Sequence, residues 1–166
     1  MKPFHALDQG PASEPGASCA QASAELAMET TMQALNWTPA LWLDFEPMDA
    51  MNRDFMALLG RAQEASDDTL VAAWQALVAH AARHFGTEDT WMQQEAFATA
   101  EQHTLEHRVV LNLLREGLVQ AQGGDQAPVR QMAAELGAWF SRHTQSLDAA
   151  LALHMRRATP SRAATD

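Results

Sequence analysis

The sequence lacks the residues that cross-link many small proteins or anchor them in membranes. Cys19 is the only cysteine among 166 residues, which excludes an internal disulfide, a cysteine-ligated zinc finger and an iron–sulfur cluster. No run of about eighteen apolar residues occurs, and the N-terminus carries no apolar signal-peptide core. We therefore expect a cytoplasmic protein, outside the membrane, in which any bound metal has nitrogen and oxygen ligands.

Basic residues are also scarce. The chain has 11 Lys and Arg against 21 Asp and Glu, for a formal net charge of −10, and no Lys/Arg cluster stands out before the C-terminal tail. Because this balance repels phosphate groups and anionic lipid, we expect no nucleic-acid or membrane partner. Hydrophobic residues make up 47% of the sequence, which is enough for one domain with its own core.

The composition changes along the chain. Residues 1–36 are rich in Ala, Ser, Gly and Pro, which predicts a flexible tail. An aromatic-rich arm with Trp37, Trp42 and Phe45 follows, and we expect it to pack across the outside of the folded domain. The domain is predicted over residues 37–156. Residues 157–166 are predicted to be a C-terminal tail, because they are too few and too polar to fold alone.

Apolar residues recur at three- and four-residue steps in four segments. They predict helices over about residues 48–65, 66–94, 99–122 and 126–155. Ser66 marks one boundary and Gly123-Gly124 another. Helices of this length with short connections pack as antiparallel neighbours. The sequence therefore predicts an all-α fold, an up-down-up-down four-helix bundle, with no competing strand.

Imidazoles and carboxylates gather on the last three of these helices. Since residues four apart lie on the same helix face, His84 is paired with Glu88, and His103 with His107. The full set is His84, Glu88, His103, His107, His143 and Asp148. Burying them without a cation would leave several polar groups unpaired, at about 1–3 kcal/mol each. We therefore expect a metal site inside the bundle.

The number and type of these ligands favour two metal ions. Six ligands exceed the four that a tetrahedral zinc ion uses, whereas carboxylates that bridge two ions about 3.5–4 Å apart would use them all. Imidazole together with carboxylate suits iron, zinc, copper or nickel. Ferritin-like di-iron bundles carry Glu-x-x-His motifs, and this sequence has none.

The histidine-rich pattern resembles the bacterial hemerythrin family over about 120 of the 166 residues. The resemblance rests on separated motifs in the right order: Trp37-Thr38-Pro39, His84-Phe85-x-x-Glu88-Asp89 with Met92 after it, His103-x-x-x-His107, and Trp139-Phe140-x-x-His143 leading to Asp148. It implies a non-haem di-iron protein that binds O2 for storage, delivery or sensing. It also implies that Glu88 and Asp148 bridge the two irons. One iron would be completed by His103, His107 and His143, and the other, which meets O2, by His84.

Asn52 departs from the family pattern. Members of the family place a histidine on the first helix in Asp-x-x-His, whereas Asp49-Ala50-Met51-Asn52 puts an amide there. Asn52 could donate its amide oxygen or leave the place to water. The sequence favours either over His80, which lies a full turn, about 5.4 Å, from His84 along the helix. Asp49 is a remote alternative, and we expect it to interact with the helix dipole instead.

The change at Asn52 keeps several functions open. The first is O2 binding at two irons, or at one, by a protein that binds its ligand and does not turn it over. The second is a di-iron oxidase or peroxidase that reacts with peroxide or nitric oxide. The third is a metal-depleted bundle that acts as an interaction domain for an unidentified protein partner.

The remaining candidates have plainer interpretations. We expect His5 and His154 to be solvated. The nine methionines are expected to fill the core. Trp74, Trp91 and Trp139 are expected to form core or pocket walls.

Overall fold

The described part of the chain folds into four packed helical segments. The computed structural model describes residues 41–163, with side chains to residue 158. The elements are α2 (Glu46–Glu64), α3 (Asp67–Gln94), α4 (Ala100–Gln122), α5 (Ala127–His143), η2 (Thr144–Asp148) and α6 (Ala149–Ala163). Residues 41–163 contain no strand, so the predicted all-α four-helix bundle is confirmed. The predicted 1–36 tail and Trp37 lie outside the described residues.

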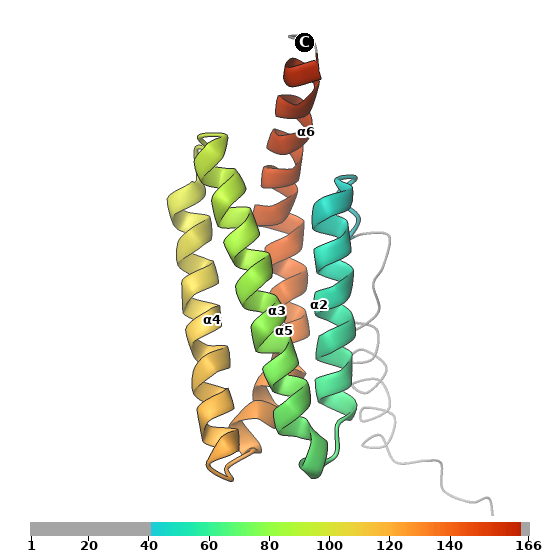
Figure 1. Cartoon of the computed structure of the whole chain (residues 1–166), viewed down its shortest axis with the longest axis vertical. Coiled ribbons are helices and arrows are strands. Elements are labelled where there is room, and N and C mark those ends of the chain that lie inside the picture. Colours follow the sequence, from blue (N-terminus) through green and yellow to red (C-terminus); the bar gives the residue numbers. More distant parts are fainter. Residues whose placement is uncertain (1–40, 164–166) are drawn as a thin grey trace, which may run out of the picture. The chain divides into compact units, whose positions relative to one another are not determined.

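The helices form a closed ring of neighbours. α2 and α4 each pack against both α3 and α5, and the helices run side by side in Figure 1. The first two connections are short, so successive helices reverse direction. Pro47 and Pro128 occupy the first turns of α2 and α5, where a missing N–H is tolerated. At the end of α4, Gly124 adopts a φ of 98°, a conformation that favours glycine.

The last helix differs from its prediction in two ways. A π-helical turn, η2, interrupts it, and α6 continues to Ala163, past the predicted end at residue 155. Met155, Arg156, Arg157 and Ala158 all favour helix, so nothing stops the helix where the bundle ends. In Figure 1, α6 extends beyond the ends of the other helices. None of the helices in residues 41–163 combines the length and apolar composition that a bilayer crossing requires.

The core consists of two apolar clusters with a polar layer between them. The larger cluster includes Phe55 of α2, Phe85 of α3, Val110 of α4 and Phe140 of α5. The smaller cluster contains Met48, Met92, Leu151 and Ala152. Seven of the ten buried polar residues in the described part of the chain make up this layer: Asn52, His84, Glu88, His103, His107, His143 and Asp148. The polar layer therefore spans all four segments.

The arm before α2 lies against the outside of the bundle. Phe45 contacts Trp91 edge to face, with ring centroids 5.5 Å apart. Trp42 is 53% exposed, and the Arg53 guanidinium lies 5.7 Å from its ring centre. Trp42 therefore lies on the outside of the bundle, against a side chain of α2. Buried Asp49 also fixes the arm, because its carboxylate accepts hydrogen bonds from the backbone N–H groups of Leu43 (2.8 Å) and Phe45 (3.1 Å).

Candidate metal centre

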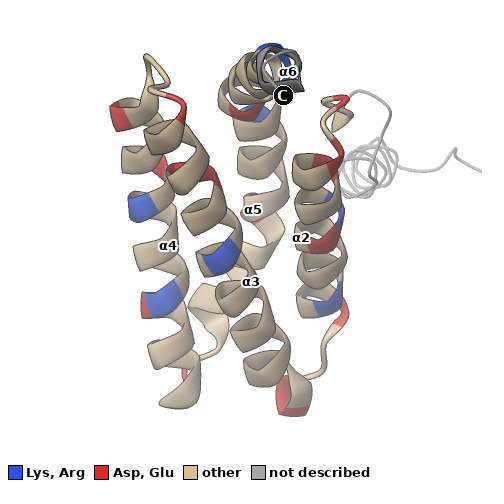
Figure 2. Cartoon of the chain, turned by 45° about the horizontal axis from the view of Figure 1, so that its top comes forward, with Lys and Arg blue, Asp and Glu red and all other residues tan. Residues whose placement is uncertain are grey.

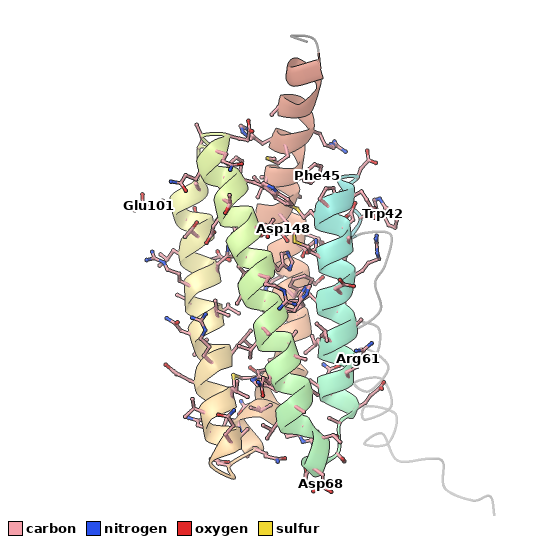
Figure 3. All side chains as sticks on the ribbon, in the orientation of Figure 1. Trp42, Phe45, Arg61, Asp68, Glu101 and Asp148 are labelled. Atoms are coloured by element: carbon pink, nitrogen blue, oxygen red, sulfur yellow. The ribbon has the colours of Figure 1, made fainter. Side chains whose placement is uncertain are left out.

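Five buried side chains converge inside the polar layer. Each offers one ligand atom, and these atoms all lie within 4.8 Å of one another: Glu88, His103, His107, His143 and Asp148. They come from α3, α4, α5 and η2. Figure 3 shows Asp148 between the helices, whereas Trp42, Arg61 and Glu101 point outwards. Such a cluster of imidazoles and carboxylates could hold a metal ion.

The nitrogen atoms in this cluster are spaced like metal ligands. The His143 Nε2 atom lies 3.1 Å from His103 Nε2 and 3.2 Å from His107 Nε2. Two nitrogen ligands at a right angle, each about 2.1 Å from one metal ion, would be about 3.0 Å apart. Asp148 Oδ1 lies 3.1 Å from His143 Nε2, and Glu88 Oε2 lies 3.1 Å from His107 Nε2. Nitrogens and oxygens therefore surround one common point.

The π-helical turn explains how His143 and Asp148 can meet there. In an α-helix, residues five apart point about 140° away from each other. η2 begins directly after His143 and ends at Asp148. A π turn bonds residues five apart, so it returns these two side chains to the same side. Such turns often occur at functional sites. The spacing of the two residues, which does not suit an α-helix, is thus matched by the local backbone.

His84 lies on the other side of Glu88. Its Nε2 atom is 3.0 Å from Glu88 Oε1, whereas Glu88 Oε2 faces His107 and His103 at 3.1 and 3.7 Å. We call the group of His103, His107 and His143 the three-histidine side, and the group of His84 and Asn52 the Asn52 side. Glu88 has one carboxylate oxygen toward each.

The buried polar atoms of this layer fit a cation. Asp148 Oδ2 and both side-chain polar atoms of Asn52 have no hydrogen-bond partner within the described residues, and Asp148 Oδ1 and Glu88 Oε2 face only imidazole nitrogens, at 3.1–3.2 Å for the nearest. Leaving such atoms unpaired costs about 1–3 kcal/mol each. In addition, the His107 and His143 Nδ1 atoms donate hydrogen bonds outward, so in the neutral tautomers the facing Nε2 atoms carry lone pairs. A cation between them satisfies these groups together.

Comparison with known proteins agrees with this geometry. Residues 44–152 match the family described as Hemerythrin HHE cation binding domain. The chain is 36% identical over 117 residues to a bacteriohemerythrin of Ralstonia nicotianae (strain ATCC BAA-1114 / GMI1000), over 70% of this chain and 85% of that protein. The chain belongs to the hemerythrin family. No solved structure gave a significant match.

Like other members of its family, this hemerythrin-like chain has the residues of an iron protein. The structure brings five of the six predicted ligands into one cluster and places the sixth, His84, against Glu88. The family match also spans all six positions and Asn52.

Two carboxylates at the outer edge of the candidate metal site were not predicted from the sequence to take part in it. Asp89 accepts hydrogen bonds from His107 Nδ1 (3.0 Å) and Thr104 (2.8 Å), and Glu106 accepts one from His143 Nδ1 (3.2 Å). Partners of this kind fix the orientation of a metal-binding imidazole and raise its basicity. Their sequence signal is weak, because each merely neighbours a predicted ligand and the bond crosses from one helix to another.

The charges in the site affect one another strongly. Burial alone would lower the pKa of His107, but hydrogen bonds and charge attraction from Asp89 and Glu88 raise it to about 9. Burial would likewise raise the pKa of Asp148, yet His103 and His143 hold it well below its ordinary range. The pKa of Glu88 is also lowered, because nearby imidazoles outweigh burial and the repulsion of Asp148. The carboxylates are therefore in their ionised, metal-binding form.

Asn52, His80 and Asp49, the three residues considered as the metal ligand from this part of the bundle, differ in the hydrogen bonds that they make. Asn52 is fully buried, and its side chain has no hydrogen-bond partner among the described residues. His80 is already engaged, since its Nε2 donates to the Met51 carbonyl oxygen at 3.0 Å. Asp49 binds backbone N–H groups of the arm. These contacts favour Asn52, with or without a water molecule, over either substitute.

The surroundings of two tryptophans agree with the sequence prediction, whereas those of His154 do not. Trp74 is buried and donates to the Leu114 carbonyl oxygen (3.0 Å), and Trp139 stacks on His143 with centroids 4.7 Å apart. Both are walls, as predicted. The expectation that His154 is solvated is wrong, because it is partly buried, contacts the Phe97 ring and donates to the Glu95 carbonyl oxygen at 3.0 Å. His5 lies outside the described residues.

Proposed function

We propose that this hemerythrin-family protein binds O2 at a dinuclear centre that contains one or two irons. In this proposal, the three-histidine side holds one ion, and His84 and the Asn52 position hold the other. Glu88 and Asp148 would supply carboxylate oxygens to both positions. The observation that carries the proposal is Glu88 itself, a buried carboxylate with one oxygen 3.1 Å from His107 and the other 3.0 Å from His84.

The bound irons would supply the electrons needed for O2 to bind. The surrounding side chains keep the site dry. Phe55 stacks on Phe140 with centroids 4.0 Å apart, and Phe85 stacks on His107 at 4.3 Å. On the opposite side, Met48 and Met92 of the smaller apolar cluster close the layer. Excluding water in this way hinders the loss of a reduced oxygen species.

Iron content and an optical spectrum test the proposal. The full-length protein would be loaded with Fe²⁺ without oxygen, desalted and analysed for iron, and its visible spectrum would be recorded in air and again after O2 removal. We expect about one to two irons per chain and an absorption band that forms in air and disappears when O2 is removed. A protein that retains no iron, or one whose spectrum is indifferent to O2, contradicts the proposal.

Asn52 favours a second candidate, an oxidase or peroxidase. An amide binds iron more weakly than imidazole does, so the Asn52 side is more open to water or peroxide. In that case air would oxidise the iron permanently, and added peroxide would be reduced with turnover when an electron donor is supplied. The same spectra therefore separate the two functions. Persistent oxidation with peroxide turnover selects the enzyme, and a reversible band selects the O2-binding protein.

A further inference from the structure

The two sides of the centre offer different donor atoms. The three-histidine side presents three imidazole nitrogens and the Glu88 and Asp148 oxygens within 4.8 Å. The Asn52 side presents one imidazole, that of His84, against Glu88 Oε1. Nitrogen therefore dominates one side, and oxygen from carboxylate, amide and water is left to dominate the other.

The position of Asn52 in the polar layer is fixed by its neighbours on α2. Met48, one turn before it, belongs to the smaller apolar cluster, and Phe55 after it belongs to the larger one. The Phe55 ring lies 6.3 Å from the ring of His84, and the carbonyl oxygen of Met51 accepts a hydrogen bond from His80. This part of α2 thus faces the His80 to His84 turn of α3. Both side-chain polar atoms of Asn52 are buried there and have no hydrogen-bond partner in residues 41–163.

The two sides also differ in the hydrogen bonds that the Nδ1 atoms of their imidazoles make. On the three-histidine side, two of the three rings donate from Nδ1 to carboxylates, His107 to Asp89 and His143 to Glu106. The Nδ1 atom of His84 is buried and has no hydrogen-bond partner among the described residues. Because such partners raise ligand basicity and metal affinity by about 10–100-fold, the three-histidine side should hold its ion more tightly.

Ligand chemistry then predicts different ions for the two sides. Imidazole suits iron, whereas carboxylate, carbonyl oxygen and water suit harder ions such as manganese. We propose that the Asn52 side is an exchangeable position that takes Mn²⁺ when both ions are present, while the three-histidine side keeps iron. The inference rests on the proposed dinuclear centre. It adds that the amide of Asn52 makes the centre a mixed iron–manganese site.

A competition experiment tests this assignment. Metal-free, full-length protein would receive equal amounts of Fe²⁺ and Mn²⁺, each sufficient to fill both positions, without oxygen, then be desalted and analysed for both metals and for the manganese EPR signal. We expect about one iron and one manganese per wild-type chain. Asn52→His should replace the manganese with a second iron. Asn52→Leu, which has no amide oxygen, should keep the iron and lose the manganese.

Met56→Leu is the matched control, because Met56 is buried one turn after Asn52 in the larger apolar cluster. It should leave the iron-to-manganese ratio unchanged, and circular dichroism would verify that every variant is folded. Wild-type protein that binds two irons, or iron without manganese, overturns the inference and leaves the dinuclear O2 proposal standing. An unchanged ratio in Asn52→His also overturns it. Wild-type protein that retains neither metal overturns both proposals.

Discussion

The two sides of Glu88 use the same bundle and the same bridging carboxylate, yet they differ in almost everything else. The three-histidine side has imidazoles from α4 and α5, two of them held by carboxylates at their outer nitrogens. The Asn52 side has His84, whose outer nitrogen is unpartnered among the described residues, and an amide. The position of a helix in the bundle and the strength of the metal ligand that it carries can therefore vary independently. A helix can keep its place in the bundle while its ligand changes.

The folding of α2 explains how this independence is possible. Its inward face is filled by Met48, Phe55 and Leu59, all fully buried, and its start is fixed by Asp49. Burying side chains of this size stabilises the fold by about 1.5–3 kcal/mol each. The helix therefore does not depend on a metal ligand at residue 52. The charged residues of α2 lie mostly on its outer face, as Figure 2 illustrates.

The largest effect is expected from the residue that both sides share. Glu88→Ala removes both carboxylate oxygens from the buried layer, so we expect the loss of both ions, with affinity lowered by more than about 100-fold. Metal analysis after desalting measures this. Glu116→Ala, at an exposed carboxylate on α4, should bind metal like the wild type. Full metal retention by Glu88→Ala would show that Glu88 does not bridge the two sides.

Removal of a single histidine from either side should have a smaller effect on iron binding, and the effect should differ between the two sides. His143→Ala removes a nitrogen that lies 3.1–3.2 Å from two others, and His84→Ala removes the one imidazole near Glu88 Oε1. We expect His84→Ala to keep about one iron and His143→Ala to retain less than that, because the three-histidine side binds more tightly. Iron analysis at increasing chelator concentration ranks the two variants. The reverse order would contradict the unequal sides.

Sequence predicts some of this arrangement well and some of it poorly, for physical reasons. The pairs His84 with Glu88 and His103 with His107 follow from the four-residue helix repeat, and the structure brings them to the same layer. The turn η2 was not predicted, because apolar periodicity does not encode hydrogen bonds between residues five apart. The bond from His107 to Asp89 depends on how α3 and α4 are rotated against each other, which no local pattern specifies.

Substitution of the outer carboxylates, Asp89 and Glu106, is expected to have an intermediate effect on iron affinity. Asp89→Asn and Glu106→Gln preserve shape but weaken the hydrogen bonds that hold His107 and His143, so we expect affinity for the more tightly held iron to fall by about tenfold in each. Chelator competition measures it. Asp89→Asn should cost more, because Asp89 is also bound by Thr104 and is less exposed than Glu106. If neither variant differs from wild type in iron affinity, the hydrogen bonds to Asp89 and Glu106 do not strengthen iron binding on the three-histidine side.

A separate effect is expected on the stability of the metal-free protein at different pH values. His107 has a pKa of about 9 in the fold, against about 6.5 for an unperturbed histidine. A pKa raised by folding means that protonated His107 stabilises the folded state. This contribution is complete below about pH 6.5 and is lost as pH rises through 9. The urea midpoint of the metal-free protein should therefore fall over this window, and His107→Gln should flatten the fall.

Metal binding should show the opposite pH dependence, because the metal needs the imidazole without its proton. Iron retention should thus rise between about pH 6.5 and 9, while the stability of the metal-free protein falls. Asp89→Asn removes one of the carboxylates that raise the pKa of His107, so it should shift both curves to lower pH. A urea midpoint that is constant from pH 6 to 9.5 in the metal-free protein would mean that the proton on His107 does not stabilise the three-histidine side.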